Sequence, residues 1–217
     1  TGFYSSPHHV SFRERIRIGN RLIPEEKVCS LIDIIKQAVG KLESRDSLKP
    51  SFFEVYTALA FLYFAYEKVD FAVIEVGLGG KLDATNVIKP VLSVITRIDV
   101  DHSRQLGETR VSVTREKAGI IKENVPLLTC SQEEDVFKVI KEKCLETNSR
   151  LTGVSLCCND TGERFFPGCH DIVFVKRNQS TIKGSRFSVH GKKYCHDNLT
   201  IPLIGEHQVL NAGLAAA

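Results

Sequence analysis

The sequence predicts an α/β fold in which a mostly parallel sheet lies between helices, with a small antiparallel β subdomain. Short continuous apolar runs, such as Phe71–Ile74 and Val91–Ile95, are typical of parallel strands that helices cover on both faces. Helical segments alternate with these runs, as expected for an α/β architecture. After Arg150 the pattern changes to short strand-like pieces separated by Gly, Asn, Asp and Pro, which favours antiparallel strands.

The first third of the chain predicts one strand and two helices. Residues Thr1–Tyr4 have the pattern of a strand end. Residues Ile23–Val39 begin with a proline and two glutamates and then repeat apolar residues at three- and four-residue steps, which predicts an amphipathic helix. A polar loop is expected at Glu43–Pro50. In Ser51–Tyr66 the first residue and the glutamate three positions later have capping-box spacing, which predicts a second, more buried helix.

The remainder of the chain divides at about residue 147. A third buried strand is expected at Pro126–Cys130 and a helix at Glu133–Glu146. Residues 1–147 should form one α/β core, residues 148–204 the antiparallel subdomain, and residues 205–217 the start of a last helix. The four strands expected in the second region are Leu151–Leu156, Ile172–Lys176, Arg186–His190 and Leu199–Ile204.

The composition excludes several classes of protein. The 217 residues are 42% hydrophobic and 25% charged, which is ordinary for a globular protein and argues against disorder or a coiled coil. The longest nearly apolar run, Thr57–Tyr66, is well short of the roughly 18 to 20 residues that cross a bilayer. Twenty-nine basic and 26 acidic residues leave a net charge of +3, too weak a bias to indicate nucleic acid or a membrane surface. We expect neither partner.

The seven cysteines do not suggest a disulfide framework, because their number is odd and several lie inside apolar runs. Reduced thiols fit the cytosol or the mitochondrial matrix. A zinc site is an alternative, but no pair has C-x2-C spacing, so we expect loop and strand thiols. The residues that this alternative would use are Cys157, Cys158, Cys169, His170, Cys195 and His196.

Polar side chains follow three predicted strands. Ser6 follows the first strand, Glu75 follows Phe71–Ile74, and His102 follows Val91–Ile95. Because ligands of parallel sheets collect at the carboxyl ends of strands, these side chains should face one crevice. Ser6 and Glu75 suit Mg²⁺ bridging phosphates, and His102 extends the preference to Mn²⁺. Alternatively, Ser6 is a turn residue and His102 a loop histidine, whereas an unpaired buried Glu75 would be costly.

Three glycines, Gly77, Gly79 and Gly80, allow a close backbone approach after the second of these strands. They do not form a G-x-G-x-x-G fingerprint, which disfavours a Rossmann dehydrogenase, and the chain has no G-x-x-x-x-G-K-[ST] phosphate loop. The residues alone therefore indicate an α/β protein with a phosphate or metal site.

Five blocks carry a family resemblance. In chain order they read TGFYSSPHHVSFRERIRI, SFFEVYTALAFLYFA, FAVIEVGLGGKLDATNVI, DHSRQLGETRVSVTREKAGIIK and IPLIGEHQVLNAGLA. Together they closely resemble the bacterial-type dihydrofolate synthase/folylpolyglutamate synthase family of the Mur ligase superfamily. The signal is weak only between about residues 132 and 200. The resemblance implies a P-loop NTPase-like central domain and a monomeric, ATP-dependent ligase.

The resemblance also implies roles for individual residues. Ser6, Glu75 and His102 match metal ligands, in agreement with the strand-end argument. Lys117 matches a lysine that is carbamylated in the superfamily, which would make it an anion able to hold a second Mg²⁺. Lys117 and His102 would then be the catalytic residues. Without the resemblance, Lys117 is an ordinary solvated helix lysine.

Further positions match the pterin and nucleotide pockets. Phe53, Asp83 and Ala84 fall where the family binds the pterin, with an aromatic ring for stacking and a carboxylate for the amino-pyrimidine edge. The alternative makes Phe53 a core residue and Asp83 a turn former. Gln208 and Asn211 lie three apart on one helical face, and Asn211 matches an asparagine near the nucleotide in relatives, so both are expected to bind ATP.

The implied reaction adds L-glutamate to dihydropteroate or tetrahydrofolate through an acyl phosphate, with ATP as co-substrate. The resemblance does not distinguish dihydrofolate synthase from folylpolyglutamate synthase activity. In the family a phosphate loop should precede Thr1 and a C-terminal ligase domain should follow Ala217, so the chain is expected to be the middle portion of such an enzyme and inactive alone. The rival hypotheses are another Mur-type amino-acid ligase and a catalytically inactive fragment.

Overall fold

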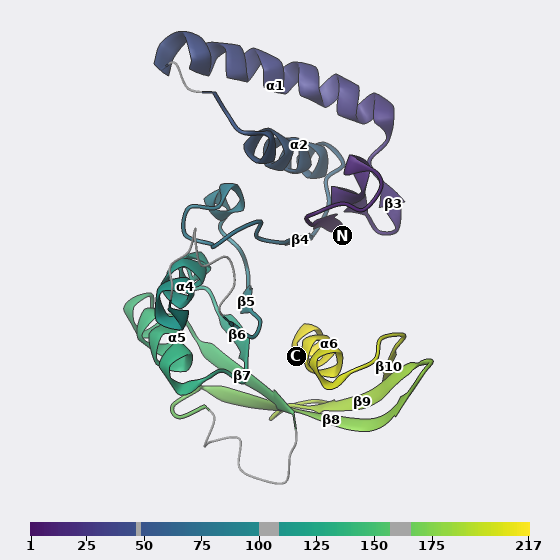
Figure 1. Ribbon diagram of the computed structural model, residues 1–217, viewed down its shortest axis with the longest axis vertical. Helices are drawn as coiled ribbons and strands as arrows, with labels where there is room; N and C mark the ends of the chain where they lie inside the picture. The colour runs from purple at the N-terminus through teal and green to yellow at the C-terminus, as the bar shows by residue number, and fades with distance from the viewer. Residues whose placement is uncertain (47–48, 100–108, 157–165) are drawn as a thin grey trace. The chain divides into compact units, whose positions relative to one another are not determined.

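The computed structural model describes residues 1–46, 49–99, 109–156 and 166–217 (Figure 1). The chain divides into two compact units, Thr1–Ile88 and Lys89–Ala217. The limits drawn from the sequence at residues 147 and 204 do not coincide with this division. Within the described residues, no helix is both long enough and apolar enough to cross a membrane.

The first unit contains a mixed sheet in the order β3-β2-β1-β4. Strands β1 and β4 are parallel, whereas β2 pairs antiparallel with both β1 and β3. A short 3-10 helix, η1, leads into β2, and a second, η2, follows β4. The bounds are β1 (Gly2–Tyr4), η1 (Phe12–Arg15), β2 (Ile16–Ile18), β3 (Arg21–Leu22), β4 (Ala72–Ile74) and η2 (Ala84–Val87).

Two helices, α1 (Glu25–Asp46) and α2 (Phe52–Tyr66), pack against each other in this unit (Figure 1). The expected capping box begins α2: the Ser51 side chain accepts a hydrogen bond from the Glu54 backbone N–H, and Glu54 accepts one from the Ser51 N–H. Helix α1 extends into the segment that was expected to be a loop. Leu59 of α2 is fully buried, which contributes about 1.5–3 kcal/mol.

The expectation that Phe71–Ile74 is covered on both faces is wrong. Strand β4 lies at the edge of its sheet and pairs with β1. The side chains of Phe71 and Val73 are 64% and 54% exposed. A short apolar run reports β-propensity, but it does not report whether a second layer covers the strand. Only Ile74, which packs against the core below α2, behaves as expected.

The second unit contains a six-stranded sheet in the order β10-β9-β8-β7-β6-β5. Strands β5 to β8 are parallel, and β9 and β10 are antiparallel to their neighbours. The expectation that residues 148–204 form a separate antiparallel subdomain is therefore wrong. Leu151–Leu156 and the strand after it continue the parallel sheet, and only the last two strands are antiparallel to their neighbours. The bounds are β5 (Ser93–Ile95), β6 (Leu127–Cys130), β7 (Leu151–Leu156), β8 (Asp171–Thr181), β9 (Gly184–His190) and β10 (Cys195–Ile201).

Helices cover both faces of this sheet, as Figure 1 shows. Leu127 of β6 joins the core beneath α4 and α5, whereas the next residue, Leu128, joins the core beneath α6. Successive strand residues point to opposite faces, so a strand between two helical layers is apolar throughout. The predicted α/β class, a mostly parallel sheet between helices, is confirmed. The helix bounds are α4 (Arg110–Lys117), η3 (Ala118–Ile120), α5 (Glu134–Glu146) and α6 (Glu206–Ala216).

Candidate functional site

Ser6 and Glu75 lie together at the carboxyl ends of β1 and β4. The parallel register pairs Tyr4 with Ile74, and the Glu75 N–H donates a hydrogen bond to the Tyr4 carbonyl at 2.9 Å. The Ser6 N–H in turn donates to Glu75 Oε2 at 2.9 Å. Glu75 is exposed, so the sequence argument from a buried carboxylate is wrong, because β4 is an edge strand. Ser6 and Glu75 nevertheless lie close together, as expected.

Asp83 organises the loop that follows Glu75. Its Oδ2 accepts hydrogen bonds from the N–H groups of Gly77 and Leu78, at 3.0 and 2.9 Å. Its Oδ1 accepts from the Thr85 N–H at 2.9 Å and the Thr85 hydroxyl at 2.6 Å, which caps η2. Asp83 therefore shapes the loop, as the turn-former interpretation predicted.

Phe53 of α2 lies against the same loop. A Cβ added to Gly77 would come within 2.4 Å of the Phe53 ring, so the ring packs directly on the glycine backbone. The Phe53 ring centroid is 6.2 Å from that of Tyr4. Ala84 begins η2 directly after Asp83. The fold therefore brings Phe53, Asp83 and Ala84 to one loop, where Phe53 is half-buried and packs against the core of the first unit.

Lys117 and the two α6 residues belong to the second unit. Lys117 is the half-buried last residue of α4, where the helix dipole favours a cation. Gln208 is half-buried and Asn211 exposed near the start of α6, on either side of the fully buried Val209. His102 lies outside the described residues.

Four of the six residues of the zinc alternative lie in the part of the chain that the structure describes, and these four do not gather into one group there. Cys169 packs against the core beneath α4 and α5, and burial raises its pKa to about 11. His170 Nδ1 accepts a hydrogen bond from the Leu151 N–H at 3.1 Å. The His196 ring packs on Tyr194, with centroids 5.5 Å apart. Cys157 and Cys158 lie outside the described residues.

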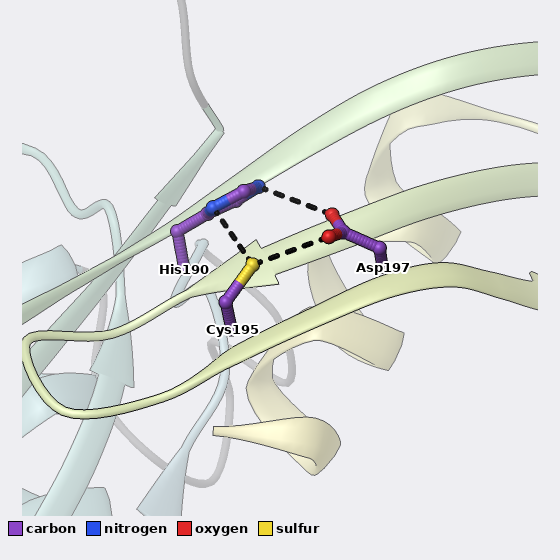
Figure 2. A group of neighbouring side chains, drawn as sticks. All are labelled: His190, Cys195 and Asp197. Atoms are coloured by element: carbon purple, nitrogen blue, oxygen red, sulfur yellow. Dashed lines mark hydrogen bonds and ion pairs between the residues drawn. The ribbon is translucent and has the colours of Figure 1, made fainter.

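A different group of side chains gathers around Cys195. His190 and Asp197 both contact its sulfur atom, as Figure 2 shows. The sequence analysis missed this group because it paired each cysteine with its sequence neighbour. Alternation along a strand places Cys195 and Asp197 on one face, and this signal was available from the sequence. Their partner from β9, His190, depends on the register of the hairpin, and the sequence does not give that register.

Comparison with known families gives one match over most of the chain: residues 28–217 match the Mur ligase middle domain. Dihydrofolate synthase/folylpolyglutamate synthase of Bacillus subtilis (strain 168) is 35% identical over 99% of this chain and 46% of its own length. Folylpolyglutamate synthase of Lacticaseibacillus casei is 33% identical over 99% of this chain and 47% of its own length. The chain thus spans about half the length of the curated relatives it matches.

Solved structures agree with this match. An FPGS–AMPPCP complex aligns with a TM-score of 0.86 and 32% identity, covering 99% of this chain and 50% of that chain. Folylpolyglutamate synthase from Thermotoga maritima aligns with a TM-score of 0.84 and 37% identity, covering 99% of this chain and 46% of that one. The family match, these alignments and the α/β architecture lead to one conclusion: the chain belongs to the Mur ligase family, through its middle domain.

Proposed function

We propose that the protein carrying this chain is an ATP-dependent ligase that adds L-glutamate to dihydropteroate, to folates, or to both. The observation that carries the proposal is the contact between Ser6 and Glu75 at two adjacent strand ends, directly before the loop on which Phe53 packs. Similar proteins named for this activity, and an FPGS–AMPPCP–folate complex that covers 99% of this chain, support the same reading.

The residues present fit a magnesium ion. Mg²⁺ prefers oxygen ligands, and the Ser6 hydroxyl and the Glu75 carboxylate supply them. Glu75 Oε2 accepts the Ser6 N–H, which orients the carboxylate while the side chain stays exposed. In this proposal His102 is a further metal ligand and carbamylated Lys117 holds a second ion, with Mn²⁺ as a second candidate metal. When bound, the ion offsets negative charge on the phosphoryl group being transferred.

The proposed reaction has two steps. An oxygen of the substrate carboxylate attacks the γ-phosphorus of ATP, so that ADP leaves and an acyl phosphate forms. The amine of glutamate then attacks the acyl carbon, phosphate leaves with the bonding electron pair, and the amine loses a proton. Ser6 and Glu75 contribute to the first step by orienting the phosphoryl group, and Gln208 and Asn211 contribute by contacting the nucleotide.

Phe53 and Ala84 are the proposed pterin contacts. An aromatic ring can stack on the flat pterin, and Phe53 is held against Gly77 with part of its surface exposed. Asp83 has a positioning role here: its four hydrogen bonds hold the loop that faces the ring. The proposed role of Asp83 therefore differs from the one that the family resemblance implies, in which its carboxylate contacts the pterin directly.

The reaction is tested by offering three acceptors separately to the protein that carries this chain: dihydropteroate, tetrahydrofolate and a muramyl nucleotide. ATP-dependent transfer of labelled glutamate to either pteroyl acceptor is the expected result. Transfer of an amino acid to the muramyl nucleotide alone would establish the other Mur-type ligase activity, and no transfer to any acceptor would establish a catalytically inactive protein. Either outcome would contradict the proposal.

The pterin contact is tested by calorimetric titration of the chain with dihydropteroate. Phe53→Leu should weaken binding by about fivefold, because loss of one aromatic stacking contact costs on the order of 1 kcal/mol. Phe52→Leu is the matched control, since the adjacent Phe52 is 62% exposed and stacks on Tyr56 instead. Equal effects of the two substitutions would contradict the assignment of Phe53.

A further inference from the structure

Three potential metal ligands meet where the β9–β10 hairpin closes. His190 ends β9 and Cys195 begins β10, and the register places the two residues directly opposite each other. Asp197 is two residues after Cys195 and therefore projects from the same face. A register shift follows His196 in β10, and Asn198 adopts a positive φ of 58°. Figure 2 shows the three side chains pointing toward one another.

The three side chains contact one another in pairs, through both ring nitrogens of His190 and both carboxylate oxygens of Asp197. Cys195 Sγ is 3.3 Å from His190 Nδ1 and 3.5 Å from Asp197 Oδ2. His190 Nε2 is 3.8 Å from Asp197 Oδ1, and one ligand atom from each residue lies within 4.8 Å of the other two. A tetrahedral ion with bonds of about 2.3 Å to sulfur and about 2.0–2.1 Å to nitrogen and oxygen needs its ligand atoms roughly 3.3–3.6 Å apart. The two sulfur distances already match.

We propose that His190, Cys195 and Asp197 form a binding site for a thiophilic divalent cation, with Zn²⁺ as its occupant. Sulfur and imidazole ligands select zinc over the hard cations, because Mg²⁺ and Ca²⁺ require six or more oxygen ligands and only one carboxylate is present. A thiolate and a carboxylate together balance the charge of the ion. Water would occupy the fourth position, as in three-ligand zinc sites.

A nucleophilic thiol is the main rival interpretation, and the geometry disfavours it. In a catalytic relay the imidazole lies between the nucleophile and the carboxylate, and the carboxylate does not touch the nucleophile. His190 contacts both partners here, but Asp197 also contacts the Cys195 sulfur directly, so the three side chains form a closed group and not a relay. A bound cation attracts both a thiolate and a carboxylate, so it would hold Cys195 and Asp197 in the contact that the structure shows.

Metal binding would fasten β10 to the sheet. Strand β10 is the outermost strand, and its first four residues are exposed. The proposed ion joins one ligand from β9 to two from β10, so it would hold the edge strand at the end where the hairpin turns. The turn contains Lys192 and Lys193, and all three ligands are exposed, so we expect weaker binding than in closed four-ligand zinc sites.

The test uses the full chain, reduced and free of metal, with Co²⁺ as the spectroscopic probe and Zn²⁺ as competitor. We expect one equivalent of Co²⁺ to produce sulfur-to-cobalt charge-transfer absorption that Zn²⁺ abolishes. Cys195→Ser should remove this absorption, and His190→Ala and Asp197→Asn should each weaken binding about tenfold or more. The matched control is Cys29→Ser, which removes an exposed cysteine from α1.

A second readout separates metal binding from misfolding of a variant. Zn²⁺ at a hundredfold excess over its Kd should raise the Tm of the unsubstituted chain by roughly 5 °C or more. Cys195→Ser should keep its metal-free Tm and lose this rise. Cobalt absorption that survives Cys195→Ser, or that Cys157→Ser/Cys158→Ser removes, would overturn the proposal, as would the absence of any binding. None of these results depends on the proposed ligase activity.

Discussion

The backbone N–H of Ser6 donates a hydrogen bond to the Glu75 carboxylate over 2.9 Å, linking residues 69 positions apart. The bond exists because β1 and β4 are parallel neighbours and both end at the same edge of the sheet. It holds one oxygen of an exposed carboxylate in place. A side chain that is oriented yet accessible has the properties of a metal ligand, and this is the basis of the first prediction.

Glu75→Gln should reduce metal-dependent turnover of the protein that carries this chain by about a hundredfold or more, because removing charge from a metal ligand weakens transition-state stabilisation. The free energy of unfolding should change little, since the amide oxygen still accepts the Ser6 N–H. Turnover against Mg²⁺ concentration and a thermal melt measure the two effects. Glu43→Gln, on the exposed face of α1, is the control. Unchanged turnover at every Mg²⁺ concentration would refute the assignment of Glu75.

Gly77→Ala should destabilise the first unit by about 1–3 kcal/mol, because the added methyl group would collide with the Phe53 ring at 2.4 Å. Gly40→Ala is the matched control: nothing lies within 4 Å of its added Cβ, and alanine favours the helix by about 0.5–1 kcal/mol. Urea unfolding of both variants is the measurement. The two substitutions should act in opposite directions, and equal stabilisation by both would show that Phe53 does not pack on Gly77.

Glu14 should make stability depend on pH in the acid range. Its carboxylate accepts hydrogen bonds from the N–H groups of His9, Val10 and Ser11, which lower its pKa from 4.5 to about 2. The unfolded chain therefore binds more protons between these values, so this stabilisation is present above pH 4.5 and disappears as the pH falls toward 2. Urea midpoints between pH 2 and 6 should show this loss in the unsubstituted chain. Glu14→Gln should make the urea midpoint less dependent on pH over this range, and Glu43→Gln should leave the pH dependence unchanged.

The buried thiols should resist alkylation in the native state. Burial raises the pKa of Cys130 to about 11 and that of Cys144 to about 12, whereas Cys29 is exposed. At pH 8 a thiol of pKa 11 has about a hundredfold less thiolate than one of pKa 9. Iodoacetamide labelling followed by mass spectrometry should therefore modify Cys29 first, and Cys130 and Cys144 only after unfolding. Comparable native rates for Cys130 and Cys29 would contradict the described core.

The same thiols predict a loss of stability in base. A folded-state pKa above the unfolded value of 9 means that the unfolded chain releases protons first, so stabilisation is complete below pH 9 and declines as the pH rises toward 11 or 12. Urea midpoints at pH 8, 9 and 10 measure this decline. Cys130→Ala should reduce its slope, and a slope unchanged by that substitution would assign the decline to other groups.

Local signals in the sequence were sufficient where a residue and its immediate neighbours decide the outcome. The capping box of Ser51 and Glu54 marks the start of α2 in the structure, and the mostly apolar run at Leu127–Cys130 forms a strand covered on both faces. Capping depends on contacts three residues apart, and burial on two faces favours apolar residues at successive positions of a strand. Such features require no knowledge of the rest of the chain.

Pairing between distant segments was decided only by the tertiary structure. The sequence of a strand does not state its neighbour, so Phe71–Ile74 was expected in a covered position but forms an exposed edge, and Leu151–Leu156 was expected to be antiparallel but pairs parallel with β6. A helical crossover, α5, joins β6 to β7, and such a connection produces parallel strands.

The candidate site divides in the same way. Position after a strand was enough to predict that Ser6 and Glu75 lie close together, because the carboxyl ends of parallel strands share one edge. Only the tertiary structure decides the exposure of Glu75, the four hydrogen bonds of Asp83 and the contact between His190 and Cys195. Each depends on register or on which lone pairs the backbone already occupies, and these are properties of the folded chain and not of any single segment.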